Sequence, residues 1–187
     1  MIETIISILL GFGLAASAGF RVFVPLFALS LATHYGYVPV GDSFTWIGGL
    51  PAIICLGIAT VVEIGAYYIP FVDNLLDTIS IPLATIAGSV VMASTLMDLD
   101  PMLTWGLAII AGGGTAAAIT TSTAAARATS TVTTGGLGNN LVSSTETATA
   151  SFVSILAIFA PIIAFIIVLL IIFVGIKMFK KVFLSGK

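Results

Sequence analysis

Long apolar stretches separated by short polar segments make up most of this chain. A helix needs about 20 predominantly apolar residues to cross the hydrocarbon core of a lipid bilayer. Five stretches meet that requirement, and they cover approximately residues 4–33, 46–69, 78–97, 102–126 and 152–176. The first is interrupted by Arg21 and Pro25, whereas the fifth contains no charged residue. The pattern therefore predicts an all-α, polytopic integral membrane protein.

Polar residues between these stretches indicate where helices begin. Asp73 and Asp77 lie in a polar turn before the third stretch, and we expect them to cap that helix and to place negative charge in its first turn. A cation site that includes the Asn74 amide is the alternative interpretation. The fourth stretch begins after Asp98-Leu99-Asp100-Pro101, where the proline suits the first turn of a helix.

A Thr-rich segment separates the last two stretches. Residues 115–151 include 16 Ser or Thr among 37 residues, and their charged residues are Arg127 and Glu146. In a helical arrangement one face carries polar side chains, and the opposite face forms a ridge of small residues of the kind that lets membrane helices pack closely. The polar face consists of Thr120, Thr123, Arg127, Ser130 or Thr131, and Thr134, and the ridge consists of Gly114, Ala118, Ser122 and Ala126.

This segment predicts two helical pieces, with a surface loop as the alternative. The fourth helix should continue past Arg127 and end near Gly135-Gly136-Leu137-Gly138, since glycine readily adopts the positive φ that a turn needs. Irregular backbone at membrane depth is tolerated only where protein or water satisfies its polar groups. We therefore expect both pieces, broken at residues 135–140, to pack inside the bundle and to face the first half of the chain. The side chains expected to point inward are Thr123, Arg127, Thr131 and Glu146, and their expected neighbours are Arg21 and Glu63.

Composition and charge support a membrane location. Hydrophobic residues make up 59% of the 187 residues and charged residues 7%, whereas soluble domains carry about 25% charged residues. Mean hydropathy is +1.23. The net charge of −2 and the lack of a basic patch give no support to nucleic-acid binding, and we expect none. We expect a single transmembrane domain with candidate halves at residues 1–77 and 78–176. All four lysines follow the last stretch, which predicts a cytoplasmic C-terminal tail over residues 177–187: Lys177, Lys180, Lys181 and Lys187.

Four charged residues interrupt the apolar regions: Arg21, Glu63, Arg127 and Glu146. Such residues are costly in lipid, so they face a partner or a water-filled cavity. An arginine followed by a glutamate occurs in each half, which suggests two inverted repeats with broken helices, as in many transporters. Each Arg–Glu pair is either a structural clamp or part of a substrate or ion site near the midplane. The residues expected to line an adjoining polar cavity are Thr60, Tyr67, Asp73, Asn74, Asp77, Thr123 and Thr131.

Enzymatic chemistry has little support in the sequence. The chain has one histidine, His34, and one cysteine, Cys55, so it lacks the ligand set of a zinc site. Gly112-Gly113-Gly114 lacks the preceding strand and the spacing of a nucleotide-binding loop, and we interpret these residues as packing or hinge glycines. We expect no enzyme activity, no cofactor and no metal.

Three segments of the chain resemble a known family. They are Ala18-Gly19-Phe20-Arg21-Val22-Phe23-Val24-Pro25-Leu26, Glu63-Ile64-Gly65-Ala66-Tyr67-Tyr68-Ile69-Pro70-Phe71-Val72-Asp73-Asn74-Leu75-Leu76-Asp77 and Thr133-Thr134-Gly135-Gly136-Leu137-Gly138-Asn139. Over most of the chain, these segments and their order are similar to those of the bacterial membrane protein family catalogued as domain of unknown function 4126. The resemblance implies a small helical membrane protein without an assigned activity. It gives additional weight to Arg21, Glu63, Asp73, Asn74, Asp77 and Arg127.

We expect a small transporter or channel for a small solute. An anion is favoured because the two arginines lie among hydroxyl donors. The alternative is a scaffold or accessory subunit in which the Arg–Glu pairs only lock helices together. The expected partners are the lipid bilayer, a small molecule or ion and, in a homo-oligomer, further copies of the chain. The expected location is the bacterial inner (plasma) membrane.

Overall fold

The computed structural model describes residues 2–184, with the side chains of residues 70, 71, 74 and 178–184 excluded. All regular structure in this range is helical. In chain order the helices are α1 (Ile2–Ala18), α2 (Phe23–His34), the 3-10 helix η1 (Asp42–Gly48), α3 (Leu50–Ala66), α4 (Pro70–Thr95), α5 (Pro101–Leu107), the π-helix η2 (Ala108–Gly113), α6 (Gly114–Thr134), α7 (Asn139–Phe159) and α8 (Pro161–Leu184).

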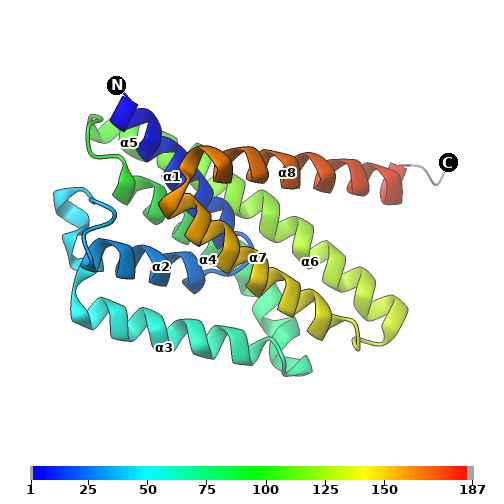
Figure 1. Cartoon of the computed structure of the whole chain (residues 1–187). Helices are drawn as coiled ribbons and strands as arrows, with labels where there is room; N and C mark the ends of the chain where they lie inside the picture. The colour runs from blue at the N-terminus through cyan, green and yellow to red at the C-terminus, as the bar shows by residue number, and fades with distance from the viewer. Residues whose placement is uncertain (1, 185–187) are drawn as a thin grey trace.

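Helix α1 lies at the centre of the bundle, where it contacts α4, α7 and α8 (Figure 1). Its second half is buried because small residues let the neighbouring helices approach closely. Gly11 lies against Met92 of α4, and Gly13 lies against Ala157 of α7. Helices α2 and α3 lie side by side, and a turn joins α6 to α7. The beginning of α1 and the end of α8 lie at opposite ends of the molecule.

Three helical stretches are long and apolar enough to cross a membrane: Leu75–Thr95, Pro101–Thr134 and Asn139–Phe159. A fourth results if η1 and α3, which meet at an angle of 64°, are counted as one broken span. Helices α1 and α2, and residues Pro161–Lys177 of α8, are shorter apolar helices. The described part of the chain is therefore an all-α protein of the membrane type with several short or broken segments. An inverted repeat stays a prediction.

Three of the five predicted stretches are divided in the structure, and the second is divided at Gly49 between η1 and α3. The first is broken at residues 19–22, close to the expected interruption at Arg21, and Pro25 lies in the first turn of α2. The fifth was predicted as one span over residues 152–176, but it is not one continuous helix. Its helix is broken at Ala160, whose backbone (φ −146°, ψ 66°) is not helical. The cause is Pro161, because the residue before a proline disfavours the helical conformation and a proline suits a helix start.

Residues 73–77 belong to a helix and do not form a turn. Helix α4 already begins at Pro70, its N-cap is Ile69, and no side chain caps it. The capping role predicted for this segment is therefore wrong, because the proline starts the helix one turn earlier. Asp73 does lie in the first turn of α4. The side chain of Asn74 lies outside the described residues.

The Thr-rich segment forms two helices, as predicted. Helix α6 continues past Arg127 to Thr134, and Gly135 and Gly136 have φ values of 64° and 88° in the turn before α7. Most of residues 128–141 are exposed, however, so the prediction that both pieces pack inside the bundle is wrong for this tip. Many hydroxyls of the segment donate instead to carbonyl groups one turn earlier in their own helix. These hydroxyls therefore need no partner from the rest of the bundle.

The small-residue ridge on α6 is exposed as well, and its members are Gly114, Ala118, Ser122 and Ala126. The close helix contact forms one turn earlier, in η2. A Cβ atom at Gly112 would lie 2.6 Å from the carbonyl oxygen of Gly88 in α4, so neither position has room for a side chain. Gly112 and Gly113 are therefore packing glycines, whereas Gly114 has no neighbour within 4 Å of that position.

Candidate functional site

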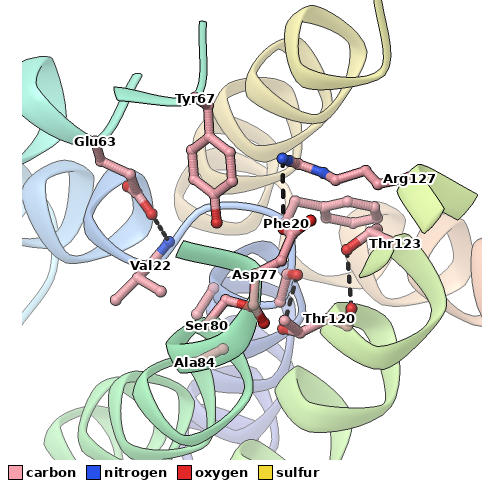
Figure 2. A pocket seen from close by; sticks show the side chains of 12 residues that line it. Phe20, Val22, Glu63, Tyr67, Asp77, Ser80, Ala84, Thr120, Thr123 and Arg127 are labelled. Carbon is pink, nitrogen blue, oxygen red and sulfur yellow. Dashed lines mark hydrogen bonds and ion pairs between the residues drawn. The ribbon is translucent and has the colours of Figure 1, made fainter. Parts of the chain in front are cut away.

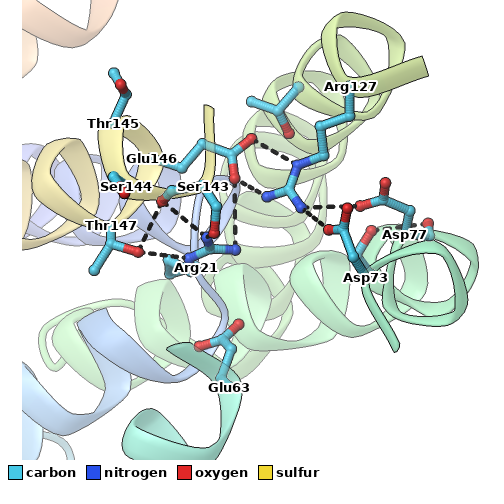
Figure 3. A network of polar contacts seen from close by, with 12 residues as sticks. Arg21, Glu63, Asp73, Asp77, Arg127, Ser143, Ser144, Thr145, Glu146 and Thr147 are labelled. Atoms are coloured by element: carbon cyan, nitrogen blue, oxygen red, sulfur yellow. Dashed lines mark hydrogen bonds and ion pairs between the residues drawn. The ribbon is translucent and has the colours of Figure 1, made fainter. Parts of the chain in front are cut away.

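A group of polar and charged side chains gathers inside the bundle where α1, α3, α4, α6 and α7 meet (Figure 3). We call it the charge cluster. Its members are Arg21, Glu63, Tyr67, Asp73, Asp77, Arg127, Asn139, Ser143, Glu146 and Thr147. The three elements that bring the two arginines together are the linker after α1, the second half of α6 and the beginning of α7.

Arg21 lies in the linker between α1 and α2 and is only 1% exposed. Its Nε donates to the Thr147 hydroxyl at 2.9 Å. Its Nη2 donates to the carbonyl oxygen and the hydroxyl of Ser143 at 2.9 and 2.5 Å. Its Nη1 lies 3.5 Å from Oε2 of Glu146. Arg21 therefore fastens the break between α1 and α2 to the beginning of α7.

Arg127 is the second buried cation, and all three of its guanidinium nitrogens contact carboxylates. Its Nε donates to Oε1 of Glu146 at 3.2 Å, and its Nη2 donates to Oε2 of the same residue. Its Nη1 lies 2.5 Å from Oδ1 of Asp73 and 3.5 Å from Oδ1 of Asp77. Glu146 is thus shared by both arginines, and Arg127 connects α6 to α4 and α7.

Glu63 makes a different contact, and in Figure 3 its side chain lies apart from the two arginines and their carboxylate partners. Its two carboxylate oxygens accept hydrogen bonds from the backbone N–H groups of Val22 and Phe23 at 2.7 and 3.0 Å. The first N–H groups of a helix lack intrahelical partners, and the helix dipole favours negative charge beside them. Glu63 of α3 therefore caps α2. In the described part of the chain no ion pair joins it to Arg21, so the Arg–Glu pair expected in the first half is not formed.

The ring of Tyr67 lies beside both arginines. The guanidinium carbons of Arg21 and Arg127 are 3.9 and 4.1 Å from its ring centroid. A guanidinium over an aromatic face gains about 0.5–2 kcal/mol. Tyr67 therefore helps to hold two like charges in one site.

Three members of the cluster were not among the expected site residues, namely Asn139, Ser143 and Thr147. The Nδ2 of Asn139 donates to Oδ2 of Asp73 at 3.1 Å and to the Thr131 hydroxyl at 3.0 Å. The three residues repeat at four-residue intervals from the start of α7, so they share one helical face with Glu146. That four-residue spacing is the sequence signal from which these three residues could have been predicted at the site.

A small cavity adjoins the cluster (Figure 2). The volume open to the centre of a water-sized sphere is about 10 Å³, which is enough for about one water molecule. Its polar lining consists of Glu63, Tyr67, Asp77, Ser80, Thr120, Thr123 and Arg127. Thr60, Asp73 and Thr131, which were expected in a polar lining, do not line it. The Thr60 hydroxyl donates to the Leu56 carbonyl at 2.7 Å, and the Asp73 carboxylate faces Arg127 and Asn139.

A second and larger cavity lies at the other end of α1. Its volume, measured in the same way, is about 440 Å³, and its lining includes Glu3, Ser7 and Leu10 of α1 together with Thr95 and Asp98. Between the two cavities, most of residues 11–18 of α1 are buried against α4, α7 and α8. The helix thus has a cavity at each end and a packed layer between them.

The broken helices and the buried charge cluster define a class: polytopic helical membrane proteins with charged groups inside the bundle. Within that class, the family described as "Domain of unknown function (DUF4126)" matches residues 8–181, and the chain belongs to this family. No curated protein and no solved structure matches the chain.

Proposed function

We propose that this protein is a small membrane transporter or channel, not an enzyme, and that its solute passes beside the charge cluster. Charged groups buried among membrane helices are costly, and they commonly mark substrate or ion paths. Six such side chains gather here, and three of them (Arg21, Glu63 and Asp73) lie at helix ends; the others are Asp77, Arg127 and Glu146. Discontinuous helices with charges at their ends are the usual frame of transporter binding sites.

The observation that carries the proposal is the pair of cavities along α1. The larger one lies at the beginning of the helix, and the polar one lies where the helix ends beside the cluster. The layer between them is built mainly from small side chains such as Gly11, Gly13 and Ala16. Small shifts of α1 against its neighbours would open a passage through this layer from one cavity or the other. Such alternate opening is the behaviour expected of a gated path.

A scaffold or accessory subunit is the second candidate, and one observation favours it. Every guanidinium nitrogen of Arg127 contacts a carboxylate, so the cluster compensates much of its own charge. The cavity beside it holds about one water molecule. Ion pairs that only fasten helices together would have the same geometry.

For its setting we propose a bacterial plasma membrane with the C-terminus in the cytoplasm, because the lysines follow the last apolar segment. We also propose that copies of the chain associate through α6. The exposed ridge of Gly114, Ala118, Ser122 and Ala126 supports this contact, since small residues at four-residue spacing let membrane helices approach closely.

Cysteine accessibility separates a transporter from a scaffold before the solute is known. Ala84 and Ala164 are both fully buried, but of the two only Ala84 lines the polar cavity. Because Cys55 is exposed, both variants are made in a Cys55→Ala background. Vesicles that contain Ala84→Cys or Ala164→Cys are treated with a small water-soluble thiol reagent.

A path that opens to water makes the Ala84→Cys variant react, whereas the Ala164→Cys variant stays unmodified. If neither cysteine reacts while the protein is folded, the scaffold replaces the transporter as the better assignment. Intact folding is checked by the melting temperature of each variant in detergent.

A further inference from the structure

We propose that the cavity beside Asp77 binds a small monovalent cation of about the size of sodium. The inference rests on the proposed transport function and gives the chemical class of the solute or coupling ion. It departs from the anion expected from the sequence. The Arg127 guanidinium and the Ser and Thr hydroxyls of the cavity, which favoured an anion, are already bound to other groups of the protein.

The arginine that lines the cavity has no nitrogen without an acidic partner. Nε and Nη2 of Arg127 donate to Glu146, and Nη1 contacts Asp73 and Asp77. An anion in the cavity would therefore have to displace one of these carboxylates. Arg21 does not line the cavity.

Four hydroxyl groups line the cavity, and the three on Ser80, Thr120 and Thr123 direct their protons at backbone carbonyls; the fourth is the Tyr67 phenol. Ser80 donates to the carbonyl of Asp77 at 3.0 Å, and Thr123 donates to the carbonyl of Thr120 at 3.0 Å. Thr120 in turn donates to the carbonyl of Gly19 at 2.9 Å (Figure 2). A hydroxyl has one proton and two lone pairs, so these three groups have lone pairs left for a cation and no proton left for an anion.

The helix ends at the cavity also favour a cation. The N–H groups at the start of α2, on Val22 and Phe23, already bind Glu63. The helix that ends at the cavity is α1, whose last residue Ala18 lines it together with Gly19. The carbonyl end of a helix carries partial negative charge, and such ends of broken helices coordinate sodium ions or protons in transporters.

The charge balance of the cluster leaves one carboxylate available. Four carboxylates share two guanidinium groups, and they belong to Glu63, Asp73, Asp77 and Glu146. Asp73 and Glu146 accept hydrogen bonds from Arg127, and Glu63 accepts two from backbone N–H groups. Asp77 has the weaker contact, 3.5 Å from Arg127, and its side chain is 23% exposed where it lines the cavity.

Size and valence favour a bare monovalent ion. The cavity of about 10 Å³ has room for one water-sized particle. A tightly held divalent ion takes six or more oxygen ligands, several of them carboxylates. Among the described residues no three His, Cys, Asp or Glu side chains converge in that way. The positive charge of Arg127 beside Asp77 also opposes a second positive charge.

Thermal unfolding of the purified full-length protein in detergent tests the proposal. Sodium chloride replaces choline chloride stepwise at constant pH and ionic strength. Because a ligand of the folded state stabilises it, the melting temperature should rise with sodium and then saturate. Asp77→Asn should abolish this rise, and Asp42→Asn, the same change at an exposed carboxylate in η1, should preserve it. Ser80→Ala keeps every charge and should raise the half-saturating sodium concentration severalfold.

The proposal is overturned if the melting temperature does not change with sodium concentration, or if it rises equally in the wild type and in Asp77→Asn. A response to pH alone, lost in Asp77→Asn, also overturns it and identifies a proton in place of sodium. The transport path is judged separately by the Ala84→Cys variant. A sodium response with an unreactive Ala84→Cys would keep the ion site and refute the path.

Discussion

Arg127 donates to both carboxylate oxygens of Glu146, so one bidentate ion pair connects α6 and α7 near their joining turn. The same carboxylate lies 3.5 Å from Arg21. Both arginines and Glu146 are almost fully buried. Among the described residues, Glu146 is therefore the carboxylate that contacts both cations.

Glu146→Gln should destabilise the protein by about 3–5 kcal/mol, because it leaves two buried guanidinium groups without a shared counter-charge. We expect a clearly lower melting temperature in detergent. Thr145→Val, at the neighbouring exposed position in α7, is the control and should have little effect. Equal melting temperatures for the two variants would show that the pair contributes nothing to stability.

Glu63→Gln should loosen the start of α2. The amide retains one carbonyl oxygen for two N–H groups and loses the charge that the helix dipole favours, at a cost of about 0.5–2 kcal/mol. Amide hydrogen exchange at Val22 and Phe23 should become faster. Glu3→Gln, a change at an exposed residue of α1, should leave both amides unaffected. Unchanged exchange at Val22 and Phe23 in Glu63→Gln would refute the capping role.

Gly112→Ala should destabilise the contact between η2 and α4 by about 1–3 kcal/mol, because the added methyl group would overlap the Gly88 carbonyl. Gly106→Ala, in α5, meets open space and should stabilise its helix by about 0.5–1 kcal/mol. Unfolding temperatures of the two variants should therefore shift in opposite directions. An unchanged unfolding temperature for Gly112→Ala would mean that η2 and α4 are less closely packed than described.

Cysteine labelling should divide the α6–α7 hairpin into an accessible tip and a buried face. Leu137 is 87% exposed and Ser143 is fully buried. In a Cys55→Ala background, Leu137→Cys should react rapidly with a water-soluble thiol reagent, and Ser143→Cys should not. Slow labelling of Leu137→Cys would place the tip in lipid or against another chain.

A reporter fused to the C-terminus should be active in the cytoplasm, because the basic tail follows the last apolar segment. Fusions of a cytoplasmic fluorescent protein and of a periplasmic phosphatase are compared in the same strain. Activity of the phosphatase alone would reverse the proposed orientation.

The sequence was most informative where periodicity is long and glycine marks a turn. The polar stripe through Arg127 predicted the extension of α6 to Thr134, and Gly135 marked its end. The break at Ala160 could also have been predicted from Pro161. The uniformly apolar composition around this proline led instead to the prediction of one continuous span. Hydropathy measures suitability for lipid and does not measure helix continuity, so it passes over such breaks.

The pairing of the buried charges was harder to predict. Arg21 precedes Glu63 by 42 positions, yet the carboxylate caps α2 and the arginine binds residues of α7. Asn139 and Ser143 lack charge and were not among the expected site residues, although they bind the charged groups directly. Partner choice depends on how the helices cross, and the pattern within each helix carries no information on that.

The distance along the chain between Arg21 and its partners has a consequence for biosynthesis. Ser143 and Thr147 follow it by 122 and 126 positions, so at about 5–20 residues per second they leave the ribosome roughly 6 to 25 s later. During that interval the arginine that follows α1 has no α7 to bind. Helix α1 and its linker are therefore expected to stay at the insertion machinery, without their final position in the bundle, until α7 has been made. The C-terminal third of the nascent chain would then complete the integration of the first helix.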